Sequence, residues 1–190
     1  MDQTDEHCPS WRHLFQSKSF ALPDVAAHLI FWPLMFLGLG LDLWTKHTVF
    51  AWLEHKPRNA ASLIDGLLEF VMHQNPGAAW GIAQGRHGFL VAVSIIALLV
   101  IFVVFLFFSG AGQRLVPTAL GLFAAGVSGN LWDRLFNAGE VRDFVRVYYG
   151  RFAWPTFNVA DTLLCVAVGL LVISTFVTGR SDQKRGRQHK

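Results

Sequence analysis

The chain has 190 residues, of which 53% are hydrophobic and 15% carry a charge. About a quarter of the residues in an ordinary soluble domain are charged, so this composition argues against a soluble globular protein. The formal net charge of +3 comes partly from a basic C-terminal tail, GRSDQKRGRQHK. Since no other basic, aromatic-interleaved segment stands out, we expect no nucleic-acid partner.

Four stretches lack Asp, Glu, Lys and Arg: 25–41, 87–113, 115–132 and 162–179. Each is long enough for a transmembrane helix, which needs roughly 20 apolar residues with a range of about 17 to 25. We therefore predict four spans at about 26–45, 88–109, 115–134 and 158–179. The run GFLVAVSIIALLVIFVVFLFFSG argues against a soluble bundle, because it has no polar face.

The predicted fold class is an all-α polytopic membrane protein with one transmembrane domain over 26–179. Residues 1–25 form a polar N-terminal tail, and residues 180–190 form a basic tail. The segment MDQTDEHCPSWRHLF is acidic and polar where a signal peptide would be basic and then apolar. It is therefore not interpreted as a signal peptide.

Cysteines and histidines indicate no additional site. Cys8 stands in the tail and Cys165 inside the fourth predicted helix, so we expect no disulfide between them. The eight histidines show no ligand spacing of the HExxH kind. We predict no metal site and no cofactor.

Polar residues gather on one side of the predicted bundle. Because spans with short connections alternate in direction, the ends of helices one and three meet the starts of helices two and four. The polar segments on that side are LDLWTK, HQNPGAAWGI, GNLWDR, VRDF and FNVAD. Polar groups inside membrane helices usually face the bundle interior and are functional candidates.

Three pairs of these residues have helical spacing, so that each pair shares a helix face: Asn158 with Asp161, Asn130 with Asp133, and Asp42 with Lys46. Two interpretations remain open for them. They either bridge and stabilise the helix ends, or they form a substrate site. The tryptophans and tyrosines on this side need no ligand, because amphipathic rings favour the headgroup level.

The direction of insertion is only weakly encoded. The 16 Lys and Arg residues divide evenly between the two sides, but those on the tail side are concentrated in 180–190. Since cytoplasmic segments carry an excess of Lys and Arg, we predict that both termini are cytoplasmic.

Asp143 and Asp161 are the two carboxylates without an obvious basic partner in the sequence. Two close carboxylates cannot both ionise, so one keeps a proton and polarises a carbonyl while the other takes a proton from water. Alternatively, each caps a helix, since Asp161 lies in the first turn of helix four, where the helix dipole favours it. The pattern alone leaves both interpretations open.

The order of these segments resembles lipoprotein signal peptidase, also called signal peptidase II. That family shows D-x-x-T-K, N-x-G-A-A, G-N-x-x-D-R, V-x-D-F and F-N-x-A-D, and all five occur here in order. The resemblance implies a multi-pass aspartyl peptidase of the bacterial inner membrane. Such an enzyme removes the signal peptide from prolipoproteins by cleaving before the cysteine that carries diacylglycerol. We accordingly expect prolipoproteins and membrane lipids as partners, and a monomer.

The resemblance also implies residue roles. The catalytic pair falls on Asp143 and Asp161. The residues of the substrate site fall on Asn75, Gly77, Asn130, Arg134, Asn158 and Asp42. A small β-rich cradle outside the membrane is implied at about 50–87, with strands within 61–75, and a short extramembrane helix near 138–152.

Three features depart from the family. Arg142 precedes Asp143 where an apolar residue is more usual, Trp80 replaces a phenylalanine, and the N-terminal extension is longer than typical. We expect the Arg142 side chain to point towards the headgroups. None of the three removes a catalytic group, so we predict an active enzyme.

Two other classes of membrane protein share part of this pattern. A small transporter or ion-coupled protein would use intramembrane carboxylates, but it predicts polar groups along the whole path, and the second side of the bundle is bare. An intramembrane peptidase of the G-x-G-D type is the other, but GLGLD at 38–42 is one residue too long for that motif.

Overall fold

The computed structural model describes residues 22–77, 83–109 and 114–188. The predicted N-terminal tail up to residue 21, the segment 78–82 with Trp80, and residues 110–113 and 189–190 lie outside the described residues. Expectations about those parts, including Cys8, therefore stay predictions.

Four long helices make up most of the structure: α1 (Val25–Leu53), α2 (His87–Phe108), α3 (Leu115–Phe136) and α4 (Val159–Gln188). Each contains a stretch long and apolar enough to cross a membrane, which confirms the four predicted spans. Helix α1 runs past its predicted end at 45 and ends at Leu53, and the side chain of Lys46 is buried and paired with Asp42 one turn earlier. Residues 180–188, predicted as a tail, continue α4.

The polar segments between the spans form an antiparallel sheet in the order β1-β2-β3-β4. Its strands are β1 (Ala60–Ile64), β2 (Leu68–Asn75), β3 (Val141–Tyr149) and β4 (Phe152–Ala153). A single 3-10 turn, η2 (Pro57–Asn59), connects α1 to β1. The strands predicted within 61–75 are confirmed.

The extramembrane helix expected near 138–152 is wrong, because this stretch forms β3 and β4. The segment VRDFVRVYY is rich in β-branched and aromatic residues, which favour a strand. It pairs with β2 along most of its length, and that pairing satisfies backbone groups which a short isolated helix would leave open. The fold is thus four membrane-length helices with a small sheet, and not strictly all-α.

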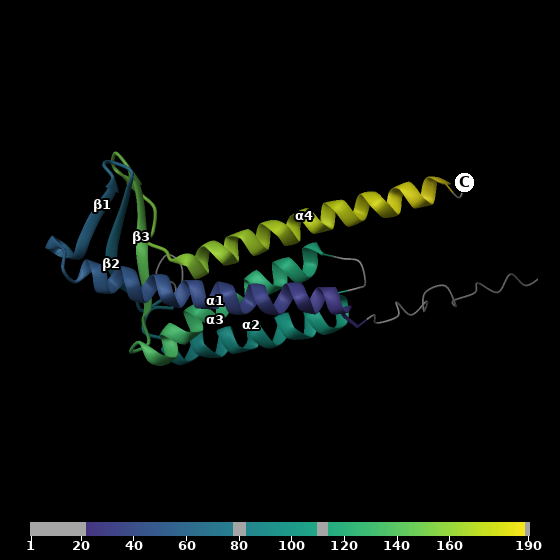
Figure 1. Cartoon of the computed structure of the whole chain (residues 1–190), viewed down its shortest axis with the longest axis horizontal. Coiled ribbons are helices and arrows are strands. Elements are labelled where there is room, and N and C mark those ends of the chain that lie inside the picture. Colours follow the sequence, from purple (N-terminus) through teal and green to yellow (C-terminus); the bar gives the residue numbers. More distant parts are fainter. Residues whose placement is uncertain (1–21, 78–82, 110–113, 189–190) are drawn as a thin grey trace, which may run out of the picture.

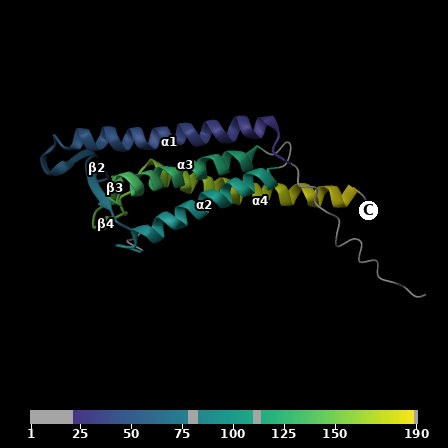
Figure 2. The same cartoon turned by 90° about the horizontal axis from the view of Figure 1, so that it is seen from below.

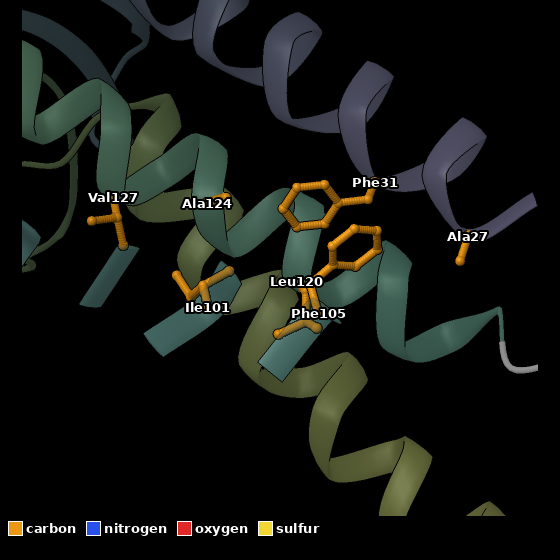
Figure 3. Close-up of a cluster of buried hydrophobic side chains, with 7 residues drawn as sticks. All are labelled: Ala27, Phe31, Ile101, Phe105, Leu120, Ala124 and Val127. Carbon is orange, nitrogen blue, oxygen red and sulfur yellow. The ribbon is translucent and has the colours of Figure 1, made fainter. Parts of the chain in front are cut away.

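The sheet stands at one end of the helices, and the C-terminal end of α4 lies at the other (Figures 1 and 2). Helix α3 is the most buried of the four spans. Near the end away from the sheet, Phe31 of α1 stacks on Phe105 of α2 with ring centroids 4.1 Å apart (Figure 3). Leu120 and Ala124 of α3 complete this apolar cluster.

Glycines on α3 bring three helices together at the sheet end. A Cβ added at Gly129 would lie 2.3 Å from Oδ2 of Asp42 on α1. One added at Gly126 would lie 2.6 Å from the carbonyl oxygen of Ala160 on α4. Small residues allow such close approach between membrane helices. They bring the polar ends of α1, α3 and α4 within hydrogen-bonding distance.

Candidate active site

A cavity of about 780 Å³ opens where the sheet meets α3 and α4. The predicted site residues on its wall are Asn75, Gly77, Asn130, Arg134, Asp143 and Asp161. Val141, Phe157 and Leu164 supply apolar wall. The cavity therefore joins β2, β3, α3 and α4, which are far apart in the sequence.

Asp143 projects from β3 and is buried. Its Oδ2 accepts a hydrogen bond from Nδ2 of Asn75 at 3.0 Å, and its Oδ1 accepts one from Nδ2 of Asn158 at 2.7 Å. Burial raises the pKa of Asp143 from 3.8 to about 7, the two amide hydrogen bonds oppose that rise, and the nearby carboxylate of Asp161 adds to it. This carboxyl group is thus shifted towards keeping its proton at neutral pH.

Asp161 lies in the first turn of α4 and combines the two roles that the sequence left open. Its backbone N–H donates to Oδ1 of Asn158 at 3.0 Å, and the backbone N–H of Asn158 donates back to Oδ2 of Asp161 at 3.2 Å. This exchange is the pattern of a capping box, here with aspartate in place of glutamate. The other carboxylate oxygen, Oδ1, accepts a hydrogen bond from Nδ2 of Asn130 at 2.8 Å. Asp161 therefore caps the helix and also lines the cavity.

Two asparagine amides connect the carboxylates. Nδ2 of Asn158, which donates to Asp143, also lies 3.1 Å from Oδ1 of Asn130. Nδ2 of Asn130 in turn donates to Asp161. The chain of contacts fixes the two aspartates relative to each other without placing a cation between them.

Arg134 joins β2 to α3 beside this pair. Its Nη2 donates to the carbonyl oxygen of Gly77 at 3.1 Å, and its Nη1 donates to that of Asn130 at 3.3 Å. Oδ1 of Asn75 accepts from the backbone N–H of Gly77 at 3.0 Å. The guanidinium therefore fixes the cavity wall and lines it as well.

Asp42 and Asn158 were predicted to bind substrate, but both lie behind the wall. Asp42 is fully buried and accepts from the backbone N–H of Ala160 at 2.8 Å. Nζ of Lys46 lies 2.7 Å from Oδ2 of Asp42 and 3.3 Å from Oδ2 of Asp133. Neither Asp42 nor Asn158 is among the residues that line the cavity. This geometry favours a supporting role for both.

The expectation that Arg142 points to the headgroups is wrong. Its Nη2 and Nε donate to Oδ1 of Asp133 at 2.6 and 3.1 Å. Asp133 is fully buried, and a buried carboxylate needs a counter-charge and donors. That need turns the Arg142 side chain inward.

Sequence reasoning did not single out His73 and Thr156, which also line the cavity. Nδ1 of His73 lies 4.0 Å from Oδ2 of Asp143 and 2.8 Å from Oγ1 of Thr156. His73 is the residue opposite Asp143 in the β2–β3 pairing. Its spacing of two from Asn75 was the available signal, since alternate residues of a strand share a face.

Within the described part of the chain, no group of three or more His, Cys, Asp and Glu side chains is arranged to hold a metal ion. What the cavity offers is two carboxylates, amide donors and an apolar wall. The fold and this cavity define a class: a membrane-spanning protein with a carboxylate pair suited to acid–base chemistry on a partly apolar substrate.

Comparison with known proteins identifies the family. Residues 34–177 match the family model described as signal peptidase (SPase) II. The chain is 37% identical over 150 residues to a lipoprotein signal peptidase of Geobacillus thermodenitrificans, covering 78% of this chain and 90% of that protein. It is 34% identical over 159 residues to one of Bacillus pumilus, covering 82% and 98%.

Solved structures agree with the sequence relatives. A bacterial membrane enzyme determined by the in meso method at 2.3 Å resolution superposes with a TM-score of 0.67 at 28% identity, covering 83% of this chain and 92% of that one. A second, at 1.9 Å resolution, gives a TM-score of 0.64, covering 82% and 96%. The chain belongs to the signal peptidase II family of aspartic peptidases. It is a lipoprotein-processing protease with membrane-spanning helices.

Proposed function

We propose that this enzyme removes the signal peptide of prolipoproteins in the bacterial inner membrane by cleaving before a diacylglyceryl cysteine. The observation that carries the mechanism is that Asp143 and Asp161 line one cavity and are linked through asparagine amides. Amide donors position a carboxylate without supplying the positive charge that would remove its basicity. The pair can therefore share one proton, as an aspartic peptidase needs.

In the proposed reaction Asp143 carries the shared proton and Asp161 is ionised. Asp161 takes a proton from water, whose oxygen attacks the scissile carbonyl carbon, while Asp143 transfers its proton to the carbonyl oxygen. The tetrahedral intermediate collapses as the C–N bond breaks. The proton taken by Asp161 goes to the departing amine nitrogen, and Asp143 recovers its own, so the net change is hydrolysis of one peptide bond.

The wall of the cavity suits a lipidated peptide. The amides of Asn75 and Asn130 and the guanidinium of Arg134 offer donors and acceptors to a peptide backbone that cannot stay unpaired in hydrocarbon. Phe157, Leu164 and other apolar side chains face the same space. Acyl chains held there add roughly 0.8 kcal/mol for each buried CH₂.

The test uses the full chain purified in detergent with a prolipoprotein in two forms, with and without diacylglycerol on its cysteine. We expect cleavage before the cysteine of the lipidated form and much slower cleavage of the other. Asp143→Asn, with both substrates, controls for contaminating proteases. Equal turnover of both forms would mean that the enzyme recognises peptide alone, which contradicts the proposal.

The proposed orientation places the sheet and cavity outside the cytoplasm and both termini inside. A cysteine placed at Ser181, in a variant whose Cys8 and Cys165 are serine, would report the side of α4. We expect an impermeant thiol reagent to label it only after the cells are opened. Labelling in intact cells would contradict this orientation and place the C-terminal end of α4 outside the cytoplasm.

A further inference from the structure

Arg142 occupies the variable position x of the V-x-D-F segment, directly before Asp143. Three of its groups contact the carboxylate of Asp133. Its backbone N–H donates to Oδ2 of Asp133 at 2.9 Å, while Nε and Nη2 donate to Oδ1 at 3.1 and 2.6 Å. One residue thus binds both oxygens of Asp133. Because the donors include main chain and side chain, the contact fixes the start of β3 against the end of α3.

The ladder between β2 and β3 is irregular beside this segment. The register shifts between the pair Phe70–Val145 and the pair His73–Asp143. A shift of this kind interrupts the ladder and bends the strand locally. Beyond the shift Asp143 pairs with His73 and Val141 pairs with Asn75, so this short ladder and the anchor that Arg142 makes to α3 together hold the segment that carries Asp143.

Arg142 also completes a balance of buried charge. Asp42, Asp133 and Lys46 are fully buried, which leaves two carboxylates for one ammonium. The guanidinium of Arg142 provides the second positive charge. Without it, Lys46 would have to neutralise both carboxylates, although its Nζ also donates to Oδ1 of Asn130 at 3.0 Å.

The effect reaches both candidate catalytic residues. Nδ2 of Asn158 approaches the carbonyl oxygen of Arg142 at 3.4 Å and donates to Asp143 at 2.7 Å. Asn130, whose Oδ1 accepts from Lys46, donates to Asp161. Arg142 itself is not among the cavity-lining residues, so its influence is indirect.

We propose that Arg142 is a positioning residue for Asp143, which acts by binding Asp133 and never contacts the substrate. The inference rests on the proposed function. It predicts that loss of the guanidinium lowers kcat and leaves KM unchanged, because the carboxylates move while the cavity wall that binds substrate stays. A displacement of about 1 Å at a catalytic group costs up to roughly a hundredfold in rate.

The experiment compares three variants with the wild-type chain in detergent, with kcat, KM and melting temperature measured for each. For Arg142→Gln we expect kcat lower by roughly tenfold to a hundredfold and KM unchanged. For Arg142→Lys we expect partial recovery of kcat, since an ammonium restores the charge but not the planar donor geometry. Arg146→Leu is the matched control: it removes an arginine of the same strand that pairs with Glu69 on the surface, and its kcat should not change.

Coupling through Asp133 is tested by combining Asp133→Asn with Arg142→Gln. If the two act as one unit, the double variant loses about as much kcat as one single variant, and the losses do not multiply.

Wild-type kcat in folded Arg142→Gln, or a change confined to KM, would overturn the proposal. If Arg142→Gln does not fold, Arg142→Lys decides: a lower kcat at unchanged KM supports the proposal, and wild-type kcat overturns it, because the guanidinium donors to Asp133 would then be dispensable. Asp143→Asn is measured in parallel. Activity in that variant would refute the catalytic pair of Asp143 and Asp161, whereas an inactive Asp143→Asn beside a fully active Arg142→Gln would refute only the role of Arg142.

Discussion

Two pairs of aspartates stand near the sheet end of the helices and have different surroundings. Asp42 and Asp133 are fully buried, contact Lys46, and lie behind the cavity wall. Asp143 and Asp161 line the cavity and accept their hydrogen bonds from amides. The same type of side chain thus pairs with cations in one case and accepts hydrogen bonds from amides in the other.

This difference separates structural from chemical use of a carboxylate. A cation within hydrogen-bonding distance stabilises the ionised form and lowers the basicity of the oxygen. Neutral amides fix the direction of the carboxylate while leaving it able to exchange protons. The cation-bound pair is therefore suited to join α1, α3 and β3, and the amide-bound pair to move protons at the cavity.

The largest expected effect is on the amide-bound pair. Asp143→Asn and Asp161→Asn each remove the shared proton chemistry and should reduce kcat by about three orders of magnitude or more, as losses of reacting groups do in other peptidases. Asparagine keeps the size of the side chain, so the protein should remain folded. Cleavage of lipidated prolipoprotein and thermal unfolding in detergent measure the two properties. Near-normal cleavage by either folded variant would leave Asp161 as a helix cap only.

The next effect is on stability and concerns the cation-bound pair. Lys46→Met leaves Asp42 and Asp133 with one fewer buried positive charge, and removing one partner of a buried ion pair costs about 3–5 kcal/mol. We expect a large fall in melting temperature and in the yield of folded protein. Asp42→Asn should be milder, because it removes a negative charge from the same cluster. A Lys46→Met protein as stable as wild type would show that the cluster does not stabilise the bundle.

The pH dependence distinguishes the pairs in a third way. The pKa of Asp143 is about 7 in the folded protein against 3.8 for the free side chain, because burial disfavours its charged form. Between these values the folded state binds more protons than the unfolded state, so this group makes the protein less stable as the pH rises towards 7. Asp143→Asn should remove that contribution. Melting temperatures of the two proteins should therefore diverge between pH 4 and pH 7, with the wild type falling further, as a series of buffers would show.

In the proposed mechanism the same proton sets the rate profile of cleavage. Activity should fall as the pH rises above about 7, because the pair then loses the proton that polarises the carbonyl. The apparent pKa of this fall in rate belongs to the pair and not to one residue, since the two carboxylates interact. A rate that stays constant from pH 6 to pH 9 would exclude a shared proton.

Much of this arrangement could be predicted from the sequence. Long uncharged stretches showed the four spans, and alternation of direction placed LDLWTK, GNLWDR, VRDF and FNVAD at one end. Local spacing also placed Asn158 and Asp161 on one helix face, and the structure shows that the two form a capping box. These features depend on hydropathy and on neighbours three residues apart, and both are visible in one chain.

The remaining features depend on contacts between distant segments. The expected helix near 138–152 is a strand because β2 is available to pair with it, and nothing near that stretch reveals this partner. Arg142 turns inward because Asp133 is buried. The burial of Asp133 depends in turn on how α1 packs on α3 through Gly129. His73 meets Asp143 only through the strand register. Each case is decided by tertiary pairing and not by local preference.

The smallest expected effect concerns another acidic residue, Glu69, whose partner on β3 is Arg146. This pair resembles Asp133 with Arg142 in chemistry and in strand, but the Arg146 side chain is 44% exposed, against 19% for Arg142. Water screens an exposed ion pair, so Glu69→Gln should change the free energy of unfolding by only about 0.2–1 kcal/mol and leave kcat unchanged. Thermal unfolding at low and high salt measures the effect, which salt should diminish further. A loss as large as that of Lys46→Met would mean that exposure does not separate the two arginine pairs, and that the position of β3 depends on the whole strand instead of on its first residues.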